Sequence, residues 1–411
     1  MSTDAPPPPE APPKLPLRAV LATYSTGIFS HSQNIIYGVI VPLWAVYLEL
    51  SPVLIGIVIG ARHVLPVCLS IHGGTLMDRF GTRRIMVVFG CVSAITAVLF
   101  PLLPAAVPLI MLQLLNGLAT NMGWVGAQTL VGHMSRGDPA QFGRLTFATR
   151  LGTFVGPIVI GAVWEHVGPW GAFVLLAFWS LALLAAVRLA EIPDQPASDT
   201  GTRPSLGEIM PKLADYIAAF AMLAVPVIAF VMAVSAIRIG GTAIRSSFYV
   251  VYLDQIGLTG TAIGFLVGSA EIIGAAGALS VGLLARRFSP HWLFLVVVVA
   301  SVVLIMITPL LGSLFPLLLL ASLMRGGTLG LSQPLMTSIL SKAAGPKAQG
   351  VSVGLRTAIN GLISMILPVI MGAVATLYGL EESFIIIGAA LLLMCLAAAW
   401  GALHANIRTG D

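Results

Sequence analysis

Residues 53–84 read VLIGIVIGARHVLPVCLSIHGGTLMDRFGTRR, and this stretch decides the fold of the chain. The part from 53 to 77 is predominantly apolar, and a cluster of basic residues follows it. A helix needs about 20 apolar residues to cross a bilayer core of roughly 30 Å. Basic residues directly after such a run are typical of a span that ends in the cytoplasm. The stretch therefore predicts a transmembrane helix.

Eleven further apolar runs fill most of the remaining sequence. Together with the first, the predicted spans lie at 17–48, 53–77, 85–104, 107–133, 142–164, 169–189, 220–252, 260–284, 292–312, 315–340, 350–377 and 383–404. Lipid offers the backbone no hydrogen-bond partner, so a span must be a helix or a strand of a closed barrel. Nothing here alternates like a barrel strand, and the runs therefore predict twelve helices.

The composition excludes a soluble protein, because 57% of the 411 residues are hydrophobic and only 9% are charged. A typical soluble domain carries roughly 25% charged residues. The cysteines at 68, 91 and 395 lie in apolar runs at unrelated spacings, which excludes a disulfide scaffold or a cysteine zinc site. The sequence holds no nucleophile–base pairing, metal-ligand cluster or phosphate-binding loop, so we expect no enzyme, no metal and no cofactor.

The basic residues predict the orientation. If the N-terminus lies in the cytoplasm, 15 Lys and Arg residues fall on cytoplasmic segments and none on the outer loops. The outer loops hold only the acids Glu49, Glu165, Asp254, Glu381 and Glu382. This asymmetry places both termini in the cytoplasm of a multi-pass protein of the cell (inner) membrane. The formal net charge of +5 thus marks topology and indicates no nucleic-acid partner.

An internal repeat divides the chain. Residues 55–80 align without gaps on 263–288, with identical pairs that include Ile55/Ile263, Gly56/Gly264, Gly60/Gly268, Gly74/Gly282, Leu76/Leu284, Arg79/Arg287 and Phe80/Phe288. Two repeats with substrate bound at their interface are one layout of transporters. We predict an all-α membrane protein with 12 transmembrane helices in two pseudo-symmetric six-helix bundles. The domains are a disordered cytoplasmic tail (1–16), the N-terminal bundle (17–192), a cytoplasmic linker (193–219), the C-terminal bundle (220–404) and a second tail (405–411).

The loop between the second and third spans carries the pattern Gly74-x3-Asp78-Arg79-x-Gly81-x-Arg83-Arg84. It resembles the signature of the major facilitator superfamily, which has twelve spans in two halves and transports solutes. The resemblance implies that the loop is a conformational latch in which Asp78 pairs with basic groups and helix ends. In the second copy Arg286 replaces the acid. The alternative is a solvated turn whose arginines only set the topology.

The fifth span contains Gly152-x3-Gly156-Pro157-x3-Gly161. This pattern is similar to a motif of the proton-antiporter and exporter branches of the superfamily, and it implies antiport and efflux. Small residues four apart also let helices approach closely, so ordinary packing is the alternative. The match is incomplete, because Ala162 stands where a second glycine is usual and Gln113 where many exporters have an arginine. The coupling role of that arginine therefore does not transfer.

Of the 21 Lys and Arg residues, 15 are counted as cytoplasmic, and the remaining six are arginines embedded in predicted spans, at 62, 150, 238, 245, 325 and 356, whereas the only embedded acid is Glu271. Six arginines facing lipid would cost roughly 15–20 kcal/mol on the insertion scale. That exceeds a typical folding stability of about 5–15 kcal/mol, so they must face protein or a watery cavity. One carboxylate cannot neutralise six guanidinium groups, and an anionic ligand is the simplest missing partner.

The predicted substrate-binding residues lie on spans one, four, seven and ten: His31, Asn34, Gln113, Asn116, Trp124, Arg238, Arg245 and Arg325. Periodicity shows only that these spans have polar faces, and the resemblance implies that the faces line one cavity. Helix–helix hydrogen bonding is the alternative for the uncharged residues. Glu271 and His63, which are equivalent in the repeat, are the candidates for proton coupling. For Glu271 the alternative is a permanent salt bridge to Arg150 or Arg245, and for His63 a structural role.

The predicted function is secondary active transport of a small anionic or zwitterionic organic solute by alternating access, with proton-coupled export. A proton-coupled uptake symporter or an exchanger of organic anions stays open. A sensor or assembly factor on the same fold fits less well, because the extramembrane parts are short. The expected partners are the solute, protons and the lipid bilayer, and we expect a monomer.

Overall fold

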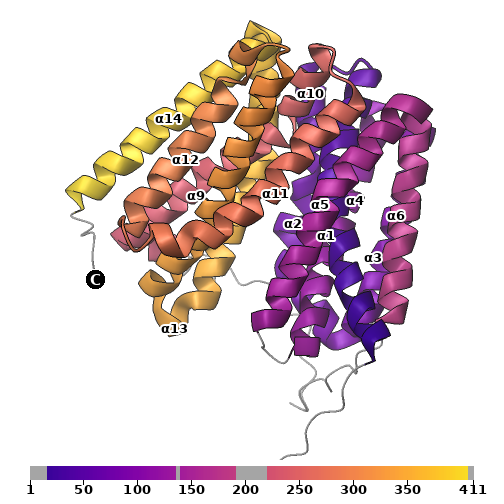
Figure 1. The fold of residues 1–411 in the computed structure, drawn as a ribbon, viewed down its shortest axis with the longest axis horizontal. Coiled ribbons are helices and arrows are strands. Elements are labelled where there is room, and N and C mark those ends of the chain that lie inside the picture. The colour runs from indigo at the N-terminus through magenta and orange to yellow at the C-terminus, as the bar shows by residue number, and fades with distance from the viewer. Residues whose placement is uncertain (1–15, 136–138, 191–219, 406–411) are drawn as a thin grey trace, which may run out of the picture.

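The computed structural model describes residues 16–135, 139–190 and 220–405, and every regular element in these ranges is a helix (Figure 1). The predicted tails and linker lie almost entirely outside the described residues. The first half contains α1 (Leu17–Tyr47), α2 (Pro52–Phe80), α3 (Thr82–Leu102), α4 (Ala106–Ser135), α5 (Pro139–Val167) and α6 (Pro169–Leu189). The second half contains α9 (Pro226–Arg245), α10 (Phe248–Gln255), α11 (Gly260–Leu284), α12 (Pro290–Met306), α13 (Phe315–Tyr378) and α14 (Leu380–His404), with short 3-10 turns at Met222–Ala224 and Thr308–Leu311.

The seventh predicted span is broken in two. The chain leaves the helix between α9 and α10, where Ser247 has φ −133° and ψ −95°. The Ser247 hydroxyl donates to the carbonyl of Ala243 at 2.5 Å. Such side-chain bonds compete with the helical backbone pattern. The start of the span is also later than predicted, because Pro226 occupies the first turn of α9, where its missing amide costs nothing.

The tenth and eleventh predicted spans form one continuous helical segment, α13, which must fold back on itself. Met336 and Asn360 lie 24 residues apart, and a straight helix would separate them by about 36 Å. Yet the Ser235 hydroxyl is 3.1 Å from both Met336 Sδ and Asn360 Oδ1. The two membrane-crossing parts of α13 are Phe315–Ala344 and Gly354–Tyr378, here called its first and second arms.

Nine segments of the described residues are long and apolar enough to cross a membrane by length and composition. Helices α1 and α4 carry more polar residues, and α12 has 17 residues. The structure buries polar side chains of α1 and α4 between helices, as at Ser30, Gln33 and Asn116. The buried surface of these two helices is therefore mixed, with polar side chains beside apolar ones such as Ile40 and Leu112.

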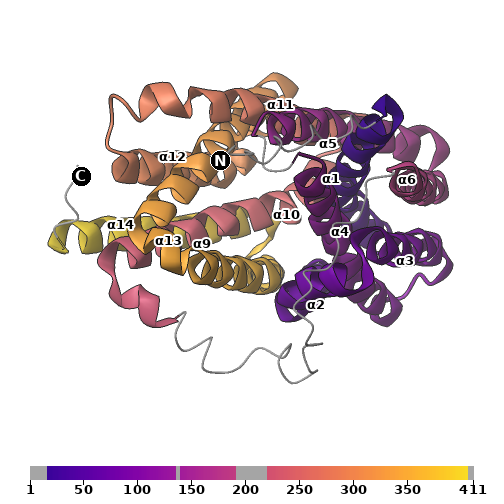
Figure 2. The same ribbon diagram turned by 90° about the horizontal axis from the view of Figure 1, so that it is seen from below.

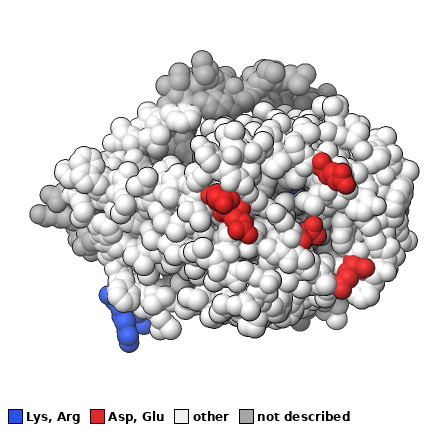
Figure 3. All heavy atoms as spheres, turned by 90° about the horizontal axis from the view of Figure 1, so that it is seen from above, with Lys and Arg blue, Asp and Glu red and all other residues white. Residues whose placement is uncertain are grey.

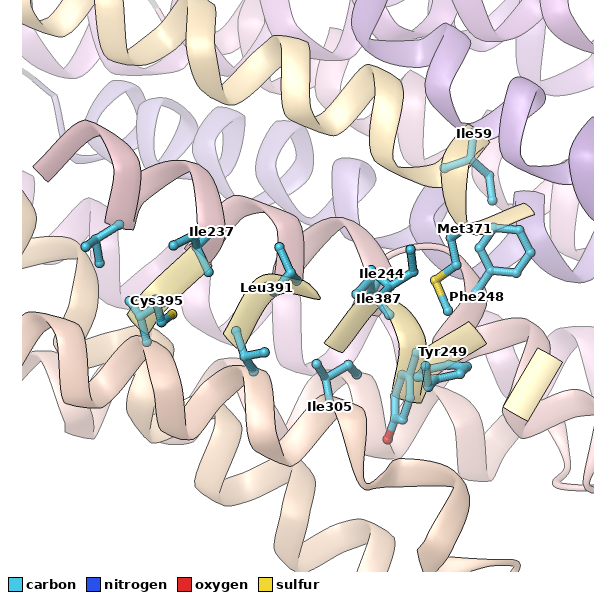
Figure 4. Close-up of a cluster of buried hydrophobic side chains, with 14 of the residues drawn as sticks. Ile59, Ile237, Ile244, Phe248, Tyr249, Ile305, Met371, Ile387, Leu391 and Cys395 are labelled. Carbon is cyan, nitrogen blue, oxygen red and sulfur yellow. The ribbon is translucent and has the colours of Figure 1, made fainter. Parts of the chain in front are cut away.

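The twelve helices form two six-helix halves that lie side by side (Figures 1 and 2). A buried cluster that includes Tyr37, Phe100 and Phe173 packs the N-terminal half. In the C-terminal half, aliphatic side chains of α9, α12 and α14 interdigitate around Ile237, Ile305 and Leu391 (Figure 4). Leu43 of α1 and Ile59 of α2 belong to the same cluster, so this apolar packing continues from the C-terminal half into the N-terminal half.

The two ends of the molecule differ in charge. The turns at one end carry Glu49, Glu165, Asp254, Glu381 and Glu382, and we call this end the acidic face. In Figure 3, which views this end, acidic side chains stand out and a basic group is prominent only at one edge. The first residues of α1 and the last of α14 lie at the opposite end, the terminal face, toward which the two halves diverge in Figure 1.

The halves meet along two helix pairs that obey the internal repeat. On one side α2 lies against the second arm of α13, and a Cβ at Gly56 would collide with the carbonyl of Pro368. On the other side α11 lies against α5, and a Cβ at Gly264 would collide with the carbonyl of Pro157. Gly56 and Gly264 are repeat equivalents. Only glycine allows such an approach of two backbones, so these positions fix how the halves contact each other.

Candidate functional site

Glu271 of α11 lies where the two halves meet, and two arginines hold its carboxylate. Arg150 of α5 donates from Nη1 to Oε2 at 2.7 Å, and Arg245, at the end of α9, donates from Nη2 to Oε1 at 3.0 Å. The side chains of Arg245 and Glu271 are 8% and 11% exposed. Because Arg150 belongs to the N-terminal half and Glu271 to the C-terminal half, the ion pair joins the two halves. The salt-bridge alternative for Glu271 is thus observed, with both predicted arginines.

Arg325 of α13 adds a third guanidinium beside this group. It lies over the ring of Tyr249, 4.4 Å from the ring centre, and its Nη2 donates to Ser322 Oγ at 3.3 Å. Within the described ranges no carboxylate lies within ion-pairing distance of Arg325. A cation–π contact stabilises a positive charge but does not neutralise it. Three arginines and one glutamate, here called the central cluster (Arg150, Arg245, Arg325 and Glu271), therefore carry an excess of positive charge.

His31 of α1 and Trp124 of α4 border the central cluster. Their rings lie 4.3 Å apart at 35°, and His31 is close enough to Glu271 and Arg150 to interact with them electrostatically. The buried Nδ1 of His31 has no hydrogen-bond partner among the described atoms. Helices α1, α4, α9 and α13 thus contribute residues at or next to the cluster, to which α5 and α11 add Arg150 and Glu271.

Arg62 is bound within the N-terminal half instead. Its Nη1 donates to the carbonyl oxygen of Asn34 at 3.0 Å, its Nη2 donates to Oδ1 of the same residue, and its guanidinium lies 5.8 Å from the ring centre of Tyr37. Asn34, a predicted substrate-binding residue, therefore contacts an arginine of the protein. Hydrogen bonds compensate the burial of Arg62, although no carboxylate among the described residues pairs with it.

Gln113 and Asn116 lie deep inside the N-terminal half, at 2% and 0% exposure. Ser93 of α3 donates to Asn116 Oδ1 at 3.3 Å and accepts from Gln33 Nε2 at 2.9 Å. Gln33 also donates to Ser180 of α6 at 2.6 Å. This polar chain ties α1, α3, α4 and α6 together. The geometry of Asn116 favours the helix-packing alternative, and its part in binding stays a prediction.

A cavity of about 250 Å³ opens between the two halves. The N-terminal half lines it with α2 and α4, and the C-terminal half with both arms of α13. Its polar lining consists of His63, Asn121, Gln333, Arg356, Thr357, Asn360 and Ser364. His63, a predicted proton-coupling residue, thus faces this cavity rather than the central cluster. Gly361 and Pro66 contribute apolar surface.

Arg356 and Arg238 place positive charge at this cavity. Arg356 lines it, and the two arginines are close enough for their charges to repel each other. The Nε atoms of both are buried and find no hydrogen-bond partner in the described part of the chain. No described carboxylate lies within 4 Å of either guanidinium. Arg238 and Arg245 lie on the same helix, α9, but have different neighbours. Arg245 belongs to the central cluster, and Arg238 lies near Arg356 of the cavity.

The residues of the predicted latch are described only in part. The segment forms the end of α2, the cap at Gly81 (φ 87°) and the start of α3. Arg83 donates to the carbonyls of Val187 and Arg188 at 3.3 and 2.8 Å, and so ties the start of α3 to the end of α6. The side chains of Asp78 and Arg79 and the surroundings of Gly74 lie outside the described part, and for Arg84 no contact is described. The latch therefore stays a prediction.

The fifth-span motif packs α5 against two helices. Gly152 and Gly156 face α1, where an added Cβ would lie 2.8 Å from Ile28 Cγ2 and 3.0 Å from Ile36 Cδ1. Gly161 faces Gly260 of α11 across the two halves, and the carbonyl of Pro157 faces Gly264. The packing alternative is therefore observed. It places the motif at a contact between the halves, and any role in antiport stays a prediction.

Sequence reasoning missed Tyr249 and the amides at the cavity. Tyr249 lies beyond the break after α9 and contacts Arg325 of α13, so no spacing along one helix could have identified it. Asn121 and Asn360 are amides inside otherwise apolar spans, and such residues mark polar contacts in a membrane protein. Among the described residues no group of three or more His, Cys, Asp or Glu side chains could hold a metal ion.

The sequence profile of the Major Facilitator Superfamily matches residues 23–350 and 230–406. The chain belongs to this superfamily. Membership agrees with the observed halves and repeat, and it identifies the protein as a membrane transporter rather than an enzyme. No curated protein matches the sequence.

Solved structures of other superfamily transporters share the fold. The nucleoside transporter NupG is 14% identical with a TM-score of 0.73, and the match covers 93% of this chain and 98% of that one. A bacterial homolog of the human lysosomal transporter Spinster is 16% identical with a TM-score of 0.71, covering 95% and 97%. A POT family transporter in complex with 5-aminolevulinic acid is 14% identical with a TM-score of 0.71, covering 92% and 95%. At such identities the likeness concerns the fold alone.

Proposed function

We propose that this transporter moves a small anionic or zwitterionic organic solute by alternating access, and that it exports the solute in exchange for protons. The observation that carries the proposal is the central cluster, in which three arginines from both halves surround one buried carboxylate. Guanidinium groups bind carboxylate and phosphate in a planar, bidentate way. A solute anion is the natural partner of the charge that Glu271 leaves uncompensated.

The cluster also supports a mechanism of coupling. Glu271 holds Arg150 and Arg245 together across the two halves, and His31 and Arg325 lie within electrostatic range. An arriving anion competes for the arginines and releases the carboxylate, which then takes up a proton because a buried unpaired carboxylate is costly. Loss of the ion pair frees one half to rock against the other. The residues proposed for solute binding are Arg245 and Arg325, with His31 and Trp124 beside them.

The topology belongs to the same proposal. We place the terminal face, and with it both termini, in the cytoplasm of the inner membrane, because the acidic face carries the loops without Lys or Arg. The bundles then span 17–192 and 220–404. With the halves in contact toward the acidic face, the conformation opens to the cytoplasm.

Transport by protein reconstituted into liposomes tests the proposal. Liposomes that contain the wild-type protein are loaded with organic acids, and an imposed pH gradient should drive the acids across the membrane. Arg325→Gln should lower the transport rate by about 100-fold, as expected for the loss of a charge-assisted contact of about 3 kcal/mol. Glu271→Gln should retain anion exchange but lose its response to the gradient. Equal transport of cationic and anionic solutes by wild type and Arg325→Gln would contradict the anion assignment.

One observation favours a second candidate, an anion exchanger without protons. Both oxygens of Glu271 are occupied by arginines, which is the geometry of a permanent salt bridge. In that case Glu271→Gln would leave the pH response of transport unchanged, because wild type would have none. The same liposome experiment therefore separates the two candidates.

A further inference from the structure

We infer that the cavity between α2, α4 and the two arms of α13 is a second anion-binding site, which takes the acidic group of a hydroxylated or amide-bearing organic acid on Arg356. The inference rests on the proposed function and specifies the class of the solute. It concerns a site separate from the central cluster, because none of the four cluster residues lines the cavity.

The arginines at and near the cavity favour an anionic ligand. Arg356 lines it, Arg238 is close enough to Arg356 for their charges to repel, and no described carboxylate is within ion-pairing distance of either. Two neighbouring guanidinium groups repel each other, and their buried Nε atoms lack hydrogen-bond partners in the described part of the chain. A carboxylate or phosphate bound to Arg356 would offset the repulsion between the two guanidinium groups, since it accepts paired hydrogen bonds from a guanidinium.

The rest of the lining fits the body of such an acid. Asn121, Gln333 and Asn360 provide amides, and Ser364 provides a hydroxyl. Amides both donate and accept, and they bind hydroxyl or amide groups without adding charge. One Oδ1 lone pair of Asn360 is already used, because Ser235 donates to it at 3.1 Å. That bond orients the amide, so that its NH2 group is the part available to a solute.

The volume and the position of the cavity agree with this role. A cavity of about 250 Å³ is slightly below the usual range of ligand sites, which begins at about 300 Å³, and suits a small acid. Both arms of α13 reach the acidic face; from the residue numbers, Arg356 lies about 18 Å nearer the terminal face than Arg325 does. A solute that leaves the central cluster toward the terminal face therefore passes Arg356.

Charged thiol reagents test the sign of the field in the cavity without any transport. The protein carries Ser364→Cys as the reporter in a background with Cys68→Ser and Cys91→Ser, because the two native cysteines are exposed. Sulfonatoethyl and trimethylammonioethyl methanethiosulfonate are compared, each rate divided by the rate with free 2-mercaptoethanol. The anionic reagent should react about tenfold faster, as attraction by nearby guanidinium predicts, and Arg356→Gln should bring the ratio close to one.

Two variants serve as controls for the thiol-reagent experiment. Arg287→Gln removes an exposed arginine outside the cavity and should leave the ratio unchanged. Arg356→Lys keeps the positive charge and should therefore keep the ratio of the two rates. Size-exclusion chromatography of each variant detects a folding defect, so that loss of charge and loss of folding are told apart. A ratio near one in the starting protein, or a ratio that Arg356→Gln leaves unchanged, overturns the inference.

A titration with succinate and with N-acetylglycine then tests binding in the wild-type background by calorimetry on purified protein. Arg356→Gln should weaken both by about tenfold or more, and Asn360→Leu should weaken N-acetylglycine more than succinate, because only the former has an amide to bind. Equal loss for both acids in Asn360→Leu would contradict the amide-binding role. If liposomes show no anion transport while the thiol ratio and titrations hold, the proposed function fails and the anion site stands.

Discussion

The two contacts between the halves share one backbone design but differ in chemistry. In the contact of α5 with α11, Gly264 and Gly268 meet the carbonyls of Pro157 and Phe154. In the contact of α2 with the second arm of α13, their repeat equivalents Gly56 and Gly60 meet the carbonyls of Pro368 and Met365. The same close approach is thus built twice.

The difference begins one turn further along. On α11 the next position of the repeat is Glu271, which pairs with Arg150. On α2 the equivalent position is His63. Gly161-Ala162-Val163 of α5 recurs as Gly372-Ala373-Val374 of α13, and at this offset Gly361 corresponds to Arg150. His63 and Gly361 line the cavity instead of forming an ion pair. A pseudo-symmetric fold therefore holds its halves together by charge on one side and leaves room for a ligand on the other.

Removal of the Glu271 carboxylate is expected to have the largest effect on stability, because only one of the two contacts between the halves depends on it. Glu271→Ala leaves the buried Arg245 and the partly exposed Arg150 without a counter-charge, and breaking a buried pair such as Arg245–Glu271 costs about 3–5 kcal/mol. The midpoint of thermal unfolding in detergent should fall by several degrees. Glu49→Gln on the acidic face, where the side chain is exposed, is the matched control and should leave the midpoint unchanged. An unchanged midpoint in Glu271→Ala would show that the pair carries little stability.

The glycine contacts are expected to give an intermediate effect. Gly264→Val and Gly56→Val each insert a side chain against a backbone carbonyl that cannot move aside, and overpacking typically costs about 1–3 kcal/mol. Equal losses of unfolding free energy in the two variants would confirm that the contacts are equivalent. Gly282→Val, at a position where an added Cβ meets nothing, serves as control. A loss confined to one of the two contacts would mean that only that one holds the halves together.

An ion pair introduced into the contact of α2 with α13 tests whether the two contacts are geometrically equivalent, and we expect it to change stability least. His63→Glu combined with Gly361→Arg copies the α5–α11 arrangement onto α2 and α13. A double-mutant cycle should give a favourable coupling of about 1 kcal/mol, and transport should slow because the new pair fills the cavity. Faster transport, or coupling of the opposite sign, would show that the two sides are not geometrically interchangeable.

The helices could be predicted closely from the sequence, while the partners of the charges could not. Predicted spans such as 17–48, 169–189 and 260–284 agree with α1, α6 and α11 within a residue or two, because length and apolarity are local properties. The break between α9 and α10 was not predicted, because residues 220–252 form one apolar run in the sequence and the backbone leaves the helix only at Ser247. The sequence predicts Asn34 as a substrate-binding residue, and the structure places it against Arg62. This contact joins two helices, and no spacing along one helix reveals it.

The sequence by itself determined that the protein is a twelve-helix membrane transporter with an internal repeat and more buried arginines than acids. The helices and the excess of arginine follow from composition and periodicity, which the lipid solvent imposes residue by residue, whereas transport was implied by the repeat and by the resemblance of the motif at 74–84. Only the tertiary structure decided that Glu271 takes two of those arginines, and that Arg356 and Arg238 have no described acidic partner and lie at a cavity. Guanidinium groups act over a few ångströms, so their chemistry depends on which helices the fold brings together.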